Sequence, residues 1–159
     1  MKFIETTKVL EGDRHNGVIG IYRKNVLIKK IPYINKKISG KVEIYNEKGS
    51  CVEETEYLSG KKNGVSRKYD DKHRLISEES YEDGKLEGRT ITYYRDGQIE
   101  SITDYKKGKI CGDLRMYDRN GRIIHNTLHE DGIITGVSYE IYDRHERFNE
   151  FDEFDDFYI

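Results

Sequence analysis

The chain has 159 residues, of which 35% are hydrophobic and 36% are charged, and its formal net charge at pH 7 is −2. The hydrophobic share is low for a domain with a thick core, where about 45–50% is usual counting glycine. The near-neutral balance excludes a strong attraction of the whole molecule to nucleic acid. Met1 to Gly20 has no continuous apolar stretch, and no run approaches the length of a membrane span, so we expect a cytoplasmic protein without a signal peptide.

The N-terminal part reads as an incomplete repeat. Phe3 to Leu10 is predicted to be a lone strand, followed by a turn over Gly12 to Gly17. The next copy, Gly17 to Ser39, is one residue shorter than those that follow and contains the single proline, Pro32. Because proline removes a backbone donor, we expect Pro32 on an edge strand. Atypical terminal repeats are typical of caps.

From Gly40 to Thr135 one pattern returns every 24 residues. A glycine opens each copy, a tyrosine follows five places later, a glycine or histidine nine places later, and a spacer glycine twenty places later. The first two columns consist of Gly40, Gly64, Gly88, Gly112 and Gly136, and of Tyr45, Tyr69, Tyr93 and Tyr117. A fixed period of this length predicts an array of identical supersecondary units.

Each unit is predicted to be a β-hairpin. Thr90–Tyr94 and Ile99–Tyr105 are rich in β-branched and aromatic residues, which favour strands. Gly97 stands between them, where a three-residue hairpin loop needs a left-handed residue. His73 and His145 replace that glycine in other copies, and histidine is enriched at positive φ. These two histidines therefore have a structural explanation.

The fold class predicted is all-β: an elongated, twisted antiparallel sheet of tandem 24-residue hairpin repeats. The fifth, eleventh and seventeenth positions of a copy share parity, so we expect them on one half-buried face, with the other face largely wet. The array is predicted to cover residues 1–147, with units that start near Gly17, Gly40, Gly64, Gly88, Gly112 and Gly136.

Residues 148–159 depart from the repeat, because phenylalanines recur at every third position with acids between them. One interpretation is a short C-terminal capping segment over the open edge of the last hairpin, since uncovered edges promote aggregation. The other is a partner-binding tail, in which aromatic anchors and acids contact a basic protein. Its binding residues would be Phe151, Phe154, Phe157, Asp152 and Asp155.

No pattern is typical of a catalytic, cofactor-binding or metal site. His125 and His129 would lie about 13 Å apart on a strand, too far apart to hold one ion. Cys51 and Cys111 belong to non-adjacent repeats and are expected to be free thiols. Paired acids such as Glu78-Glu79 alternate between faces and are interpreted as solvated surface. We expect a protein that is not an enzyme and requires no cofactor or metal.

Lysines concentrate in or near the turns. Stacked repeats would align some of them as a basic stripe, which anionic lipid head groups attract. The alternative is that they provide solubility and protect strand edges; Asp83, Glu87 and Glu130 interrupt the stripe. The lysines concerned are Lys29, Lys30, Lys36, Lys37, Lys61, Lys62, Lys106, Lys107 and Lys109.

Three segments, Tyr81–Gly88, Tyr93–Gly97 and Tyr105–Lys109, resemble the MORN-type repeat, and more closely its bacterial variant in the YwqK-like antitoxin family. The likeness covers about Gly12 to His145. It implies a repeat sheet and brings no catalytic residue. We therefore expect a non-enzymatic protein-binding module, with an antitoxin or immunity protein that neutralises a toxin as its most concrete form. The alternative is a MORN-type scaffold that binds anionic membrane lipids through loop lysines. No nucleic-acid partner is expected, and the oligomeric state is left open.

Overall fold

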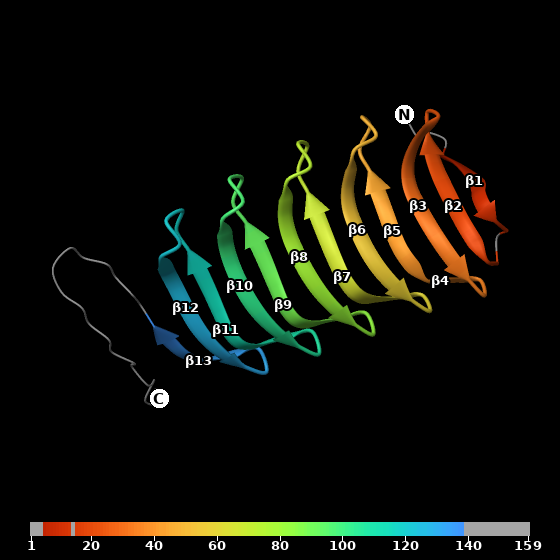
Figure 1. Ribbon diagram of the computed structural model, residues 1–159. Helices are drawn as coiled ribbons and strands as arrows, with labels where there is room; N and C mark the ends of the chain where they lie inside the picture. The colour runs from red at the N-terminus through yellow and green to blue at the C-terminus, as the bar shows by residue number, and fades with distance from the viewer. Residues whose placement is uncertain (1–4, 14, 139–159) are drawn as a thin grey trace. The chain divides into compact units, whose positions relative to one another are not determined.

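The computed structural model describes residues 5–13 and 15–138, which form one antiparallel sheet of 13 strands and contain no helix (Figure 1). Along the sheet the strands follow the order of the chain, except that the two-residue strand β4 lies beside β3, off that path. The predicted all-β class and the succession of antiparallel hairpins are confirmed. The predicted capping segment, 148–159, lies outside the described residues.

The chain divides into two compact units, Met1–Lys85 and Leu86–Ile159. The strands of the first unit are β1 (Glu5–Gly12), β2 (Gly17–Arg23), β3 (Val26–Ile34), β4 (Lys37–Ile38), β5 (Gly40–Tyr45), β6 (Cys51–Leu58), β7 (Lys61–Tyr69) and β8 (Leu75–Glu82). Those of the second are β9 (Lys85–Tyr93), which starts at the boundary residue, β10 (Ile99–Lys106), β11 (Lys109–Tyr117), β12 (Ile123–Glu130) and β13 (Ile133–Ser138).

Two-residue turns join one hairpin to the next. Their two residues have positive φ, 51° at Ser59 and 91° at Gly60, and the spacer glycine takes the second place. This is the dihedral pattern of the type I′ turn, whose twist matches that of the flanking strands. The N–H of Gly60 donates to the carbonyl of Ile38 at 2.7 Å, so the turn is also tied to the repeat before it.

The loop at the tip of each full hairpin has a left-handed residue at the ninth place, as predicted. The φ values are 82° at Gly49, 58° at His73, 89° at Gly97 and 76° at Gly121. Three of these loops carry an Asn or Asp at the sixth place. In one of them, Asp70 Oδ1 accepts the backbone N–H groups of Lys72 at 2.9 Å and of Arg74 at 3.0 Å. A short polar side chain thereby closes the loop upon itself.

A second column of tyrosines stands at the seventeenth place of three copies and consists of Tyr57, Tyr81 and Tyr105. It lies on the opposite face of the sheet from the tyrosines of the fifth place, and the prediction that these two places share one face was wrong. Strand β5 runs without a break from Gly40 to Tyr45, so these two residues face opposite sides. Gly40 is paired with Tyr57, which therefore faces away from Tyr45. The cause is a β-bulge: between Ile44 and Tyr45 the pairing skips one residue of β6. One extra residue reverses the parity of everything beyond it.

One face of the first unit, here called face A, holds its three buried hydrophobic residues and two buried hydroxyl residues. Cross-strand pairing joins Ile19 to Ile31, Val42 to Thr55, and Thr55 to Ser66. All five are at most 9% exposed. Thr55 Oγ1 and Ser66 Oγ lie 2.8 Å apart and share a hydrogen bond, which satisfies both buried hydroxyls. A half-buried face therefore exists, but small residues form its centre instead of the fifth-column tyrosines.

Pro32 is not on an edge strand, contrary to the prediction. Strand β3 is internal, with β2 on one side and β4 and β5 on the other. Pro32, which has no backbone N–H, stands where β3 changes partner, between the pairing of Tyr33 with β4 and the pairing of Lys30 with β5. There the Pro32 carbonyl accepts the N–H of Ser39 at 3.1 Å. An interior proline is tolerated because no ladder donor is needed at this corner.

Candidate protein-binding surface

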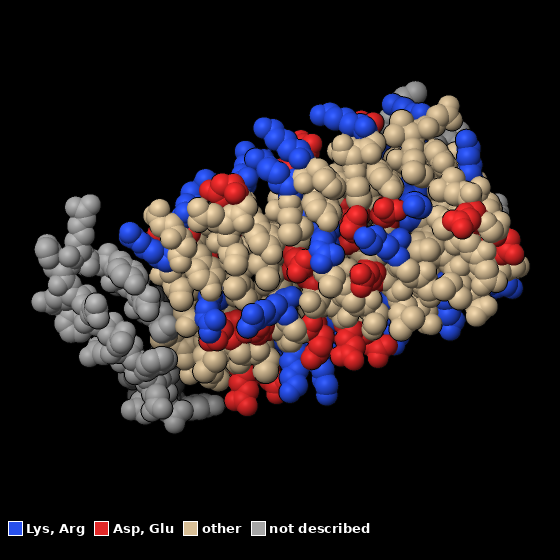
Figure 2. Space-filling model, in the orientation of Figure 1, with Lys and Arg blue, Asp and Glu red and all other residues tan. Residues whose placement is uncertain are grey.

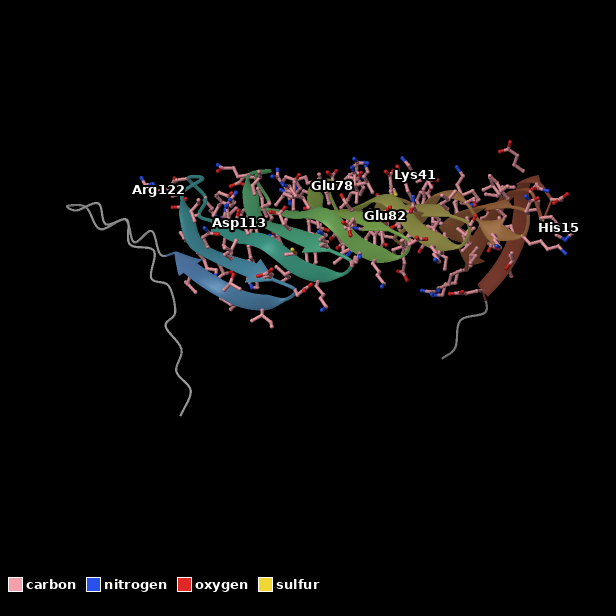
Figure 3. All side chains as sticks on the ribbon, turned by 90° about the horizontal axis from the view of Figure 1, so that it is seen from below. His15, Lys41, Glu78, Glu82, Asp113 and Arg122 are labelled. Carbon is pink, nitrogen blue, oxygen red and sulfur yellow. The ribbon has the colours of Figure 1, made fainter. Side chains whose placement is uncertain are left out.

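The opposite face of the first unit, here called face B, carries a row of charged side chains across five neighbouring strands. The cross-strand register pairs Lys30 with Glu43, Glu43 with Glu54, Glu54 with Arg67, and Arg67 with Glu78. Lys41 adjoins this row, and Figure 3 shows Lys41 and Glu78 on the same side of the ribbon. We call these six residues the charged row.

Ion pairs hold the side chains of the charged row in place. Lys30 Nζ lies 3.2 Å from Glu43 Oε2, and Lys41 Nζ lies 3.2 Å from Glu54 Oε2. Arg67 Nε donates to Glu78 Oε2 at 2.7 Å. The side chains of Glu43 and Glu54 are each only 22% exposed. Pairs of this kind contribute about 0.2–1 kcal/mol each, so their main consequence is orientation.

Charges of both signs are interspersed over the strands on the face drawn in Figure 2. Glu78 and Glu79 illustrate how the chain achieves this, because neighbours along a strand point to opposite faces. Glu78 pairs with Arg67 on face B, and Glu79 pairs with Lys68 at 2.8 Å on face A. The predicted alternation of paired acids is confirmed, but these acids are half-buried and ion-paired.

Two tyrosines of the fifth column, Tyr45 and Tyr69, stand beside the charged row on face B. Burial raises the pKa of Tyr45 to about 12, and the carboxylate of Glu43 acts in the same direction. The ring of Tyr69 stacks on His73, with centroids 4.5 Å apart and planes inclined by 20°. His73 Nδ1 lies 3.2 Å from the carbonyl oxygen of Cys51. Stacking and the loop conformation thus account for His73 without a catalytic role.

Both cysteines, Cys51 and Cys111, are free thiols. Burial raises the pKa of Cys51, and the nearby carboxylate of Glu54 raises it further. A thiol that stays protonated is a poor nucleophile. Its Sγ instead donates a weak hydrogen bond to the carbonyl of Glu53 at 3.4 Å.

Seventeenth-column tyrosines form a second cluster, on face A of the first unit. Tyr57 is paired with Lys62, whose Nζ lies 4.6 Å from the ring centroid of Tyr81. The Tyr81 hydroxyl donates to Glu79 at 2.7 Å. Burial raises the pKa of Tyr81, and the hydrogen bond to Glu79 raises it further. The hydrogen bond to Glu79 also raises the pKa of Lys68. This cluster, like the charged row, consists of long side chains with fixed partners.

The residues assigned structural roles from the sequence occupy equivalent places in the two units. As the hairpin geometry predicted, the tyrosine of the fifth place faces the residue of the eleventh. The opening glycine faces the residue of the seventeenth place. The pairs are Tyr45 with Cys51, Tyr69 with Leu75, Tyr93 with Ile99, Tyr117 with Ile123, Gly64 with Tyr81, Gly88 with Tyr105, and Gly112 with His129.

Gly64 shows why this column requires glycine. Its φ is 105°, which L side chains rarely adopt, and a Cβ there would overlap the carboxylate of Glu56. That carboxylate accepts the N–H of Val65 at 3.2 Å. Glycine therefore provides both the backbone conformation and the space for a side-chain-to-backbone hydrogen bond.

The predicted tail residues, Phe151, Phe154, Phe157, Asp152 and Asp155, lie outside the described residues. Within residues 5–13 and 15–138, no group of three or more His, Cys, Asp and Glu side chains is arranged to hold a metal ion. The same part of the chain has no helix with the length and apolarity needed to cross a bilayer.

No model of a known protein family matches the chain, and no curated protein matches it. Among solved structures, the fold is similar to part of one chain in a crystal structure of a GtfA/B complex bound to UDP and GlcNAc. That similarity has a TM-score of 0.34 and 14% sequence identity, and it covers 75% of this chain and 23% of that chain. A likeness this low carries no argument, so function must be argued from the surface itself.

Proposed function

We propose that the protein is a non-enzymatic protein-binding module built from hairpin repeats of the MORN type, in the bacterial variant of the YwqK-like antitoxins. The observation that supports it most is the charged row, whose side chains are oriented by one another before any partner arrives. Ordering a long side chain on binding costs about 0.5–1.5 kcal/mol, and a preformed surface avoids much of that cost. A fixed pattern of both signs also favours a partner with the complementary pattern over other proteins.

The first unit alone is large enough for such an interface. Seven of its strands lie side by side in the sheet, and at about 4.8 Å per strand they span about 34 Å. Strands of seven to nine residues are about 23–30 Å long. One face therefore offers at least about 800 Å², which is the contribution of one partner to a standard stable interface.

The most concrete form of the proposal is an antitoxin or immunity protein that binds a toxin in the cytoplasm. We would co-express the full chain with each product of the neighbouring genes and measure whether it restores growth that the other product arrests. Growth rescue with co-purification of the two proteins is the expected result. If no neighbouring product gives either growth rescue or co-purification, the proposal is rejected.

A pair of variants on strand β8 tests whether the charged row carries the binding. Glu78→Lys reverses a charge of the row, whereas Glu82→Lys makes the same change at an exposed position outside it. We expect Glu78→Lys to weaken binding by about tenfold or more, since a close charge pair across an interface is worth about 1.5 kcal/mol or more. Glu82→Lys should bind like the parent, and circular dichroism should show both variants folded.

The competing proposal is a scaffold that binds anionic membrane lipids through loop lysines. One of these lysines, Lys61, is already paired with Asp83 at 3.1 Å, which reduces the charge available to lipid at that turn. Flotation of the full chain with vesicles of phosphatidylserine and phosphatidylcholine, at low and high salt, separates the two proposals. Salt-sensitive flotation supports the scaffold, and its absence eliminates it.

A further inference from the structure

Strands β3 and β5 stay paired over a short distance, as β3 does with the two-residue strand β4. Their register contains two pairs, Lys29 with Ile44 and Lys30 with Glu43, whereas β2 and β3 share a register from Gly17 to Arg23. On the side of the hairpin tips, a depression of about 520 Å³ lies beside this junction. We call it the β3–β5 depression; Figure 1 shows where the two strands lie.

The lining of the β3–β5 depression combines apolar residues with charged and polar ones, which are Glu5, Arg23, Lys29, Asn46 and Glu47. Ile21, Ile28, Ile44 and Tyr45 supply its apolar part. A recess of several hundred Å³ that combines apolar residues with groups able to form ion pairs and hydrogen bonds is typical of ligand and anchor sites. Ile21 and Ile44 both pair directly with Lys29, one from each neighbouring strand.

Lys29 is the cation of this site that is available to a ligand. The other cation of the lining, Arg23, donates to Glu5 at 2.6 Å, and the next lysine along β3 belongs to the charged row. Among the described residues, no acidic side chain forms an ion pair with Lys29. The remaining acid of the lining, Glu47, is exposed on the β5–β6 loop. Lys29 is a half-buried residue that pairs across the strands with two isoleucines, so its side chain favours a carboxylate that is attached close to an apolar group.

We propose that the β3–β5 depression docks an extended acidic segment of a protein partner, with an apolar side chain in the depression and a neighbouring carboxylate on Lys29. This inference rests on the proposed protein-binding function and assigns a second contact to it, on the other face of the sheet from the charged row, because Lys29 shares face A with Ile31 and Lys30 does not. A side chain that anchors in a pocket of its partner is the usual form of an interface hot spot. The partner is therefore recognised by an aromatic or aliphatic residue that is followed or preceded by Asp or Glu.

Fluorescein-labelled synthetic peptides test this directly against the full chain by fluorescence anisotropy. The probe is GSFDEFDGS, and its controls are GSFNQFNGS without acids, GSADEADGS without anchors and GSFKKFKGS with reversed charge. We expect saturable binding of the probe that weakens as salt is raised. The three control peptides should each bind at least about tenfold more weakly, which corresponds to about 1.4 kcal/mol.

Matched variants assign the binding to the depression. Lys29→Gln removes the charge, Lys29→Glu reverses it, and Lys72→Glu makes the same reversal at an exposed loop lysine that does not line the depression. We expect a loss of about tenfold or more with Lys29→Glu, a smaller loss with Lys29→Gln and no change with Lys72→Glu. No binding of GSFDEFDGS, or equal binding by the parent and Lys29→Glu, would overturn the inference.

The growth-rescue assay separates this inference from the proposed function. If a toxin is neutralised equally well by the parent and by Lys29→Glu, the docking site is rejected and the protein-binding function stands. If no neighbouring product is neutralised or bound by the parent, the function itself is rejected, whatever the peptides do.

Discussion

Substitution of Gly64 by alanine tests the structural reason for the glycine that opens each repeat. The φ of 105° would be strained for alanine, at a cost of about 1–3 kcal/mol. The new Cβ would also lie 3.0 Å from Glu56 Cβ and would overlap the Glu56 carboxylate. Displacing that carboxylate sacrifices its hydrogen bond to Val65, worth about 1.5–3 kcal/mol for a charged acceptor. We expect Gly64→Ala to lower the free energy of unfolding by about 2.5–6 kcal/mol.

Gly49→Ala is the matched control. Gly49 also has a positive φ, 82°, but no atom lies within 4 Å of the place its Cβ would take. Only the backbone cost of about 1–2 kcal/mol applies there. Urea denaturation followed by far-ultraviolet circular dichroism measures both variants under the same conditions.

A double-mutant cycle isolates the steric part of the argument. In a Glu56→Ala background the carboxylate is gone, so Gly64→Ala should cost only its backbone strain. The coupling between the two positions should then be about 1.5–3 kcal/mol, the part assigned to the hydrogen bond of the displaced carboxylate. Equal losses for Gly64→Ala and Gly49→Ala, together with zero coupling, would refute this account of the column.

Three further predictions concern single interactions. Thr55→Val leaves the hydroxyl of Ser66 buried without its partner, so unfolding free energy should fall by about 1–3 kcal/mol. Urea unfolding should show that Ser66→Ala lowers the unfolding free energy less in the Thr55→Val background than in the parent; additive losses would contradict the shared hydrogen bond. The hydrogen bonds from Arg74 lower the pKa of Asp70 to about 2 from its ordinary value of 3.8, so its stabilisation is present above about pH 4 and is lost as pH falls towards 2. Between those values the parent should lose more stability than Asp70→Asn in urea titrations; parallel losses would exclude the effect. The pKa of Tyr45 is raised to about 12 from 10, so the parent should keep its stability below pH 10 and lose it as pH rises towards 12. Tyr45→Phe should lose less over this range, and phenolate absorbance of the parent should show one late-titrating tyrosine that the variant lacks.

Local signals in the sequence were sufficient to predict the hairpins. Gly49 and His73 both adopt the left-handed conformation expected of the ninth place, since a tight loop imposes it on whichever residue stands there. The spacer glycines likewise mark the turns between hairpins, as at Gly60 and Gly84. The charged row was harder to predict from the sequence. The acids of the charged row could be placed on alternating faces, but their basic partners come from other strands.

The amino-acid sequence by itself determined the repeat, the all-β class and the turns, because these depend on residues within a few positions of each other. The tertiary structure decided which face each tyrosine occupies, where Pro32 falls and where the β3–β5 depression forms. One bulged residue in β6 separates Tyr45 from Tyr57, and the end of the β3–β5 ladder leaves Lys29 between two isoleucines. Both features depend on strand register, which arises from contacts between distant segments and cannot be predicted from any single segment of the chain.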